Sequence, residues 1–190
     1  MKKHIFLLQL LIALLCLNAK TLLAEDMGKL SGNVVVLESG VMMLGGHNII
    51  LWGIDPLAND QQCWQNKRAW PCGEQARLAL NHYLENRLIQ CNVKSKLSNI
   101  GGGKFSAQCF RTKDHKQADI ARYLVHEGWA RDNHDVSDGL YAPDEEDARL
   151  HRRGIWTSRF QTAQDWTDGI PRYVEYKQTP ESVHKKVSLQ

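Results

Sequence analysis

GNVVVLESGVMMLGGHNIILWGIDPLANDQQC, residues 32–63, alternates apolar runs with glycines. Leu30–Leu37 is apolar and rich in β-branched residues, which predicts a strand. Val41–Leu44 and His47–Trp52 are the next two apolar runs, and the glycines at 45 and 46 are typical of a tight turn between strands. The pattern therefore predicts three consecutive strands.

In the rest of the chain, segments with apolar residues at helical spacing alternate with runs of β-branched residues. Residues at helical spacing predict helices, and β-branched runs predict strands. We expect helices at Gly73–Asn86, Gln117–Trp129 and Pro143–Arg153, the last ended by Gly154, and strands at Leu88–Lys96 and Lys104–Thr112. We expect a loop at Pro56–Pro71 and a mobile glycine-rich linker at Leu97–Gly103.

Several short motifs occur in a fixed order along the chain. They are Gly53-Ile54-Asp55, Trp70-Pro71-Cys72-Gly73, Ala118-Asp119-Ile120-Ala121, Gly128-Trp129-Ala130 and Gly154-Ile155-Trp156. Together they resemble the staphylococcal nuclease (thermonuclease-like) family, over roughly Leu30 to Trp166. The resemblance implies an α+β fold, a five-stranded OB-type barrel with three helices.

The same resemblance locates the nuclease site. The family's Asp-Gly-Asp-Thr turn falls on Glu38-Ser39-Gly40-Val41, so that Gly40 replaces a metal-binding acid. The other metal aspartate is retained as Asp55. The two phosphate-binding arginines fall on Ile50 and Lys104, and the general-base glutamate falls near Ala58.

These replacements remove most of the chemistry that a nuclease needs. Calcium takes six to eight oxygen ligands, and loss of one transition-state donor costs about 10²–10³ in rate. We therefore expect a non-catalytic binding module with no cofactor. The alternative is a calcium-dependent nuclease with an altered site, in which Asp55 binds the metal. Asp55 is otherwise a turn-forming residue before Pro56.

The N-terminus has the pattern of a signal peptide. Lys2, Lys3 and His4 precede the short apolar run Ile5–Leu17, and small residues offer cleavage after Ala24 or Ala19. The alternative is an uncleaved anchor. Cleavage after Ala24 makes the protein periplasmic or secreted, and it divides the chain into a signal at 1–24, a domain at 25–170 and a flexible polar tail at 171–190.

The charge of the domain is close to neutral. The whole chain has 24 Lys+Arg and 21 Asp+Glu. The signal holds three of the lysines, and the tail holds four basic and two acidic residues. Residues 25–170 therefore hold 17 basic and 19 acidic residues. Nucleic-acid binders usually carry a basic excess, so an envelope protein or a polysaccharide is favoured as partner, for example in exopolysaccharide production.

Four cysteines follow the signal, an even number that suits an oxidising compartment. Three pairings are open, and the strand layout favours Cys63–Cys72 and Cys91–Cys109. A zinc site is disfavoured because no Cys-x-x-Cys pair occurs.

Two tryptophans are candidates for stacking on a ligand. Trp52 and Trp64 lie around the loop of the nuclease-like site, and exposed indole rings stack on bases or sugar faces. The alternative for the tryptophans of this loop is packing against the barrel.

Overall fold

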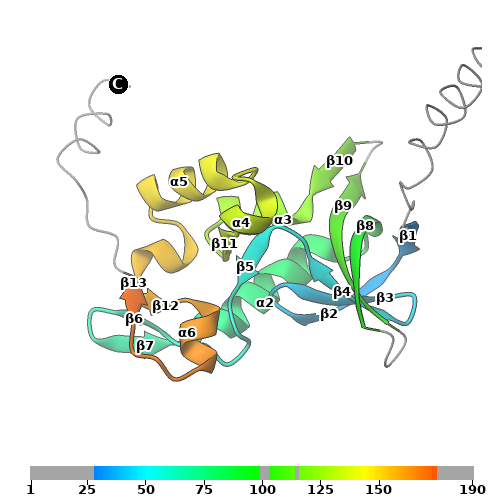
Figure 1. The fold of residues 1–190 in the computed structure, drawn as a ribbon. Helices are drawn as coiled ribbons and strands as arrows, with labels where there is room; N and C mark the ends of the chain where they lie inside the picture. The colour runs from blue at the N-terminus through cyan, green and yellow to red at the C-terminus, as the bar shows by residue number, and fades with distance from the viewer. Residues whose placement is uncertain (1–27, 99–102, 114–115, 175–190) are drawn as a thin grey trace, which may run out of the picture.

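The computed structural model describes residues 28–98, 103–113 and 116–174. The expected signal, residues 99–102 of the expected linker and residues 175–190 lie outside this part of the chain. The described residues form a mixed α+β structure around a curled sheet (Figure 1).

The sheet consists of six strands in one path, with a seventh added to it. The path runs β1-β8-β9-β4-β3-β2, and β10 pairs with β9. The bounds are β1 Lys29–Gly32, β2 Val34–Glu38, β3 Val41–Leu44, β4 His47–Leu51, β8 Leu88–Ser98, β9 Lys104–Lys113 and β10 Lys116–Asp119. All pairings are antiparallel except β4 with β9, which is parallel.

Within the described residues, three helices of seven or more residues accompany the sheet. They are α2 (Cys72–Leu84), α3 (Ile120–His126) and α5 (Ala142–Leu150). Short elements complete the fold: β5 Ile54–Pro56, β6 Cys63–Gln65, β7 Arg68–Trp70, β11 Ala130–Asp132, α4 His134–Ser137, the 3-10 turn Gly154–Thr157, β12 Phe160–Gln161, α6 Ala163–Thr167 and β13 Tyr173–Val174. Figure 1 shows α4 and α5 beside β5 and β11, whereas β6, β7, β12, β13 and α6 gather at the end away from the curled sheet.

The apolar residues form two buried clusters. The larger one fills the concave side of the sheet, where Met42, Ile49 and Ile89 meet Leu80 of α2 and Leu124 of α3. The smaller one joins the start of α2 to the C-terminal segments and includes Trp156 and Phe160. Alternating burial along β3 and β4 sends every second residue into the larger cluster.

Both favoured disulfides are present. Cys63–Cys72 ties β6 to the first residue of α2. Cys91–Cys109 joins residues that face each other across β8 and β9. These bonds are consistent with an exported protein.

Five sequence expectations need correction. The strand expected at Leu30–Leu37 is interrupted at Asn33, between β1 and β2. The loop expected at Pro56–Pro71 contains the β6–β7 hairpin, whose turn residues Asn66 and Lys67 have positive φ.

The helix expected from Gln117 is also wrong at its start. Gln117 and Ala118 pair with β9 as part of β10, and α3 begins after Asp119 because that carboxylate accepts hydrogen bonds from the amides of Ala121 and Arg122.

The helix expected to end at Gly154 ends earlier, at Leu150. Arg152 already adopts the left-handed conformation, with φ of 53°. Gly154 begins the following 3-10 turn instead. Two residues of the expected tail, Tyr173 and Val174, form β13 and pair with β12.

Candidate functional site

Three of the nuclease-like positions, Val41, Ile50 and Lys104, lie on the outward face of β3, β4 and β9. Val41 and Ile50 are directly paired across these strands, and each is half-buried. Lys104 is exposed at the start of β9, opposite Asn48 and on the same side as Ile50. Val41 and Ile50 present hydrocarbon at the positions that the resemblance assigns to the nuclease site.

Gly40 lies beneath the ring of Pro56. A Cβ atom at Gly40 would lie 2.5 Å from the Cβ of Pro56 and 2.6 Å from its Cγ. Two hydrogen bonds hold this approach: the Leu51 amide donates to the Gly40 carbonyl at 2.9 Å, and the buried Ser39 Oγ donates to the Leu57 carbonyl at 2.7 Å. The space that a second metal-binding acid would need is therefore filled.

Asp55 is half-buried and already has a partner. Asn133 Nδ2 donates to Asp55 Oδ1 at 2.7 Å, and Arg131 faces Asp55 across the β5–β11 ladder. Burial raises the pKa of the Asp55 carboxyl above its ordinary value, against the lowering effects of the Asn133 hydrogen bond and the charge of Arg131. The contacts suit a residue that fastens β5 to the segment before α4.

Glu38 and Ala58 complete the set of positions. Glu38 is exposed at the end of β2, next to a bulge in the β2–β3 ladder. Ala58 belongs to a tight turn, in which its amide donates to Gln61 Oε1 at 3.0 Å and its carbonyl accepts from the Gln61 amide at 3.0 Å.

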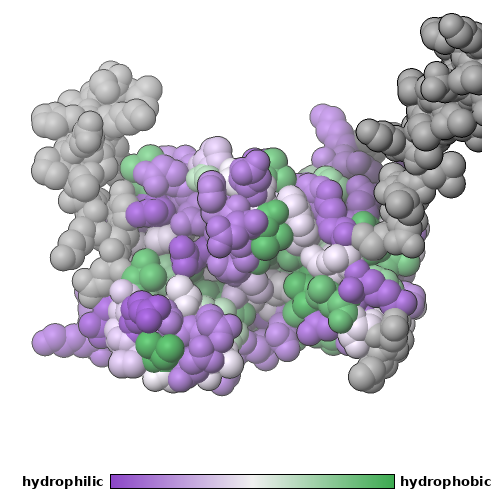
Figure 2. All heavy atoms as spheres, viewed as in Figure 1, coloured by the Kyte–Doolittle hydropathy of each residue, from purple (hydrophilic) through white to green (hydrophobic). Residues whose placement is uncertain are grey.

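The neighbouring surface of the sheet is apolar. Val35, Leu37 and Met43 are 55%, 39% and 39% exposed, and Val35 pairs with Met43 across β2 and β3. Figure 2 shows hydrophobic side chains gathered over this part of the sheet. An anionic phosphodiester finds few partners on such a face. Within residues 28–98, 103–113 and 116–174, no group of three or more His, Cys, Asp or Glu side chains is arranged to hold a metal ion.

The two candidate tryptophans have different surroundings. Trp52 is half-buried, its ring lies 6.5 Å from that of Tyr141, and Lys94 Nζ lies 4.9 Å from its centroid. Trp64 belongs to an aromatic cluster, with ring centroids 6.3 Å from Trp166 and 5.2 Å from Tyr173. Both rings therefore pack on other side chains, and Trp64 lies away from the nuclease-like positions, in the hairpin with β7.

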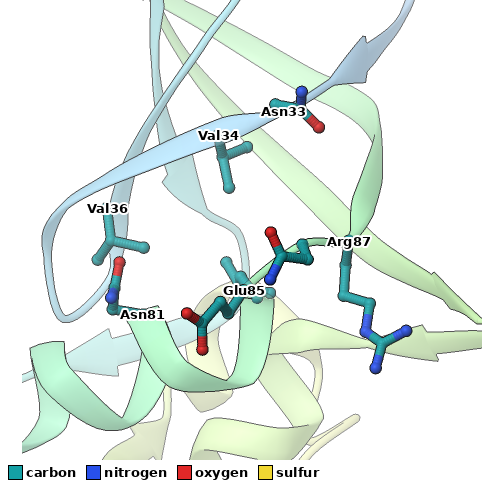
Figure 3. Close-up of a pocket in the computed structure, with 8 residues that line it drawn as sticks. Asn33, Val34, Val36, Asn81, Glu85 and Arg87 are labelled. Atoms are coloured by element: carbon teal, nitrogen blue, oxygen red, sulfur yellow. The ribbon is translucent and has the colours of Figure 1, made fainter.

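Sequence reasoning missed a row of three surface hollows. The first, about 310 Å³, lies between β2 and the C-terminal half of α2 (Figure 3). The second, about 450 Å³, is lined by Arg87, Arg111 and Tyr123 among others. The third, about 560 Å³, extends past Tyr123 to Asp144. No motif indicates these hollows, because their residues come from separate elements, β2, α2, β9, β10, α3 and α5.

Tyr83 and Tyr123 stand where the second and third hollows adjoin. Their rings are stacked, with centroids 3.6 Å apart and planes 3° apart. The guanidinium of Arg111 covers the ring of Tyr83 at 3.9 Å. Burial raises the pKa of both phenols, so that both hydroxyls remain hydrogen-bond donors at neutral pH.

Comparison with known proteins finds a distant relative. No family model matches the chain. The chain is 27% identical over 146 residues to the succinoglycan biosynthesis protein ExoI of Rhizobium meliloti strain 1021, an alignment that covers 74% of this chain and 73% of that protein. Membership of the thermonuclease-like family stays a prediction. Within the described residues, no helix is long and apolar enough to cross a bilayer.

Proposed function

We propose that this chain is an exported accessory protein of exopolysaccharide production that acts by binding rather than by phosphodiester cleavage. The observation that carries the proposal is the similarity to a succinoglycan biosynthesis protein over nearly three quarters of both chains. Two disulfides support a place outside the cytoplasm.

The chemistry of the nuclease-like positions supports the non-catalytic part of the proposal. Asp55 is one carboxylate, and calcium needs several oxygen ligands. Pro56 fills the place above Gly40. Ile50 offers no donor to a phosphate, and a missing transition-state donor lowers a rate by about 10²–10³.

We further propose that the sheet is an OB-type barrel on a thermonuclease-like scaffold. Its strand path begins at β1 and ends at β2, which follow each other in the chain with only Asn33 between them. One bent strand can in this way pair at both ends of the path. The parallel pairing of β4 with β9 is the other support.

Retention of Asp55 favours one rival, a calcium-dependent nuclease with an altered site. A cleavage assay separates the nuclease from the binding protein. The purified protein is incubated with single-stranded DNA and with RNA, first in calcium and then in EDTA. We expect no EDTA-sensitive cleavage. Cleavage that EDTA abolishes and that Asp55→Ala removes would establish the nuclease.

Deletion of the gene tests the role itself. We expect the deletion strain to secrete less exopolysaccharide, or a product of altered chain length, and the wild-type gene to restore it. An unchanged amount and size distribution of exopolysaccharide would refute the proposed role.

A further inference from the structure

The three hollows form a row because they share lining residues. The first and second share Glu85, Asn86 and Arg87, which lie where α2 passes into β8. The second and third share Tyr83 and Tyr123. Each hollow falls within or near the range of about 300–1,000 Å³ that is typical of small-ligand sites. A row of adjoining sites fits an elongated ligand better than a compact one.

The lining of the row has the chemistry that recognises sugars. Asn33, Asn81 and Asn86 line the first hollow, together with Val34 and Val36. Figure 3 shows both valines pointing from β2 toward α2, and the guanidinium of Arg87 pointing away from them. The tyrosine pair follows: Tyr83 lies between the guanidinium of Arg111 and the ring of Tyr123, so that Tyr123 supplies the ring face for a ligand. Amides bond sugar hydroxyls, and aromatic rings pack on the apolar faces of sugar rings.

The middle hollow carries positive charge. Arg87 and Arg111 both line it, with His82, against the single carboxylate of Glu85. Among the described residues, neither guanidinium has a carboxylate within salt-bridge distance, whereas six other arginines do. A carboxylate that enters this hollow would meet two forked donors.

Part of this arrangement also has a structural role. Arg111 Nη1 donates to the Tyr83 carbonyl at 3.0 Å, and this carbonyl lies in the last turn of α2, where helices leave acceptors open. Capping accounts for one of the five donors of Arg111. It does not account for the position of Arg87 or for the succession of the hollows.

We propose that the three hollows form one groove that binds an acidic oligosaccharide, with a carboxylate of the sugar chain held between Arg87 and Arg111. Tyr123 lies at the middle of this groove and packs against a sugar ring. The ligand class rests on the proposed role in exopolysaccharide production; the groove itself rests on the geometry alone.

A nucleic acid fits the groove less well. Asp119 and Asp144 line the third hollow with Arg122, which forms an ion pair with Asp144, and Glu85 lines both the first and the second hollow. A polyphosphate would meet these carboxylates along its whole length, whereas an oligosaccharide carries its charges at intervals. The slight acidic excess of residues 25–170 points the same way.

The test is calorimetric titration of the purified full-length exported protein. The probes are oligosaccharides prepared from the producing strain's own exopolysaccharide, before and after chemical reduction of their carboxyl groups to alcohols. We expect binding of the acidic probe, and at least about tenfold weaker binding of the reduced probe, because charge-assisted hydrogen bonds are lost.

Matched variants locate the site. Arg87→Gln and Tyr123→Leu should each weaken binding about tenfold or more. Arg68→Gln and Tyr173→Leu make the same chemical changes away from the groove, on β7 and β13, and should leave binding unchanged. Circular dichroism of each variant verifies that it is folded.

Three results would overturn the groove: no binding of either probe, equal binding of both probes, or equal losses in the groove variants and their controls. The deletion strain separates this failure from failure of the proposed function. Altered exopolysaccharide without groove-dependent binding rejects the groove alone; groove-dependent binding with unaltered exopolysaccharide rejects the role alone.

Discussion

Because Gly40 has no side chain, Pro56 packs directly against it. The approach of Pro56 places a proline ring where a second acid would stand. Asp55 precedes Pro56 in β5. At the metal position that the resemblance implies, Asp55 therefore has no second carboxylate beside it.

Restoring the family's acid at this position is therefore expected to damage the fold. Gly40→Asp should lower the free energy of unfolding by about 2 kcal/mol, because overpacking of a filled site costs about 1–3 kcal/mol. Urea denaturation measures the change. Lys104→Arg, which restores a family arginine at an exposed position, should change stability by less than about 0.5 kcal/mol. Undiminished stability of Gly40→Asp, together with new calcium binding, would contradict this account.

The raised pKa of Asp55 predicts a pH dependence of stability. A carboxyl with a raised pKa in the folded state is favoured in its protonated form, so stability falls as pH rises through the unfolded value of about 3.9 and beyond. Asn at this position keeps an oxygen for the Asn133 amide and cannot ionise. We expect the stability advantage of Asp55→Asn over wild type to grow from about pH 3.5 to pH 7.

Thermal or urea unfolding across this pH range measures the difference, with both proteins in EDTA to exclude metal effects. A stability advantage of Asp55→Asn that shrinks as pH rises would show that the folded protein favours the ionised form of Asp55.

At the scale of elements, Asp119 shows how one side chain sets a boundary. Its carboxylate caps α3 and also accepts hydrogen bonds from Gln108 Nε2 at 2.9 Å and from the Tyr141 hydroxyl at 3.0 Å. It therefore joins β9, β10, α3 and the start of α5.

Asp119→Ala should accordingly cost more than loss of a cap alone. Removal of a cap costs about 0.5–2 kcal/mol, and each buried donor left without a partner adds about 1–3 kcal/mol. We expect a loss of at least about 2 kcal/mol in urea denaturation. Asp119→Asn, which keeps an acceptor for the cap, should lose less. Equal losses in both variants would show that the cap is unimportant.

The strands were predictable where apolar residues alternate. The expectations at Val41–Leu44 and Leu88–Lys96 agree with β3 and with most of β8. The strand at Gln117 and Ala118 was not predictable. Its β-ladder with Thr112 and Arg111 outweighs the local helical spacing of the apolar residues. The β6–β7 hairpin was missed because its turn is Asn66-Lys67 rather than a pair that contains glycine.

The site was predictable only in part, for the same reason. The convergence of Gly40, Val41 and Ile50 follows from strands that are adjacent in the chain. The stack of Arg111, Tyr83 and Tyr123 joins three separated elements, and no local spacing encodes it.

At the scale of the whole molecule, the curled sheet presents two different surfaces. One is the apolar face around Val35 and Met43, which includes the nuclease-like positions Val41 and Ile50. The other is the row of hollows along α2 and α3, which is polar and aromatic. The proposed groove and the nuclease-like positions Val41 and Ile50 therefore lie on separate parts of the fold.

Complementation of the deletion strain with Asp55→Asn tests the central claim most directly. The measurement is the amount of exopolysaccharide secreted, at matched levels of exported protein. We predict that Asp55→Asn restores production as fully as the wild-type gene, because no metal chemistry at Asp55 is required. Failure of this variant to restore production, with the wild type restoring it, would show that the acid at position 55 performs a reaction.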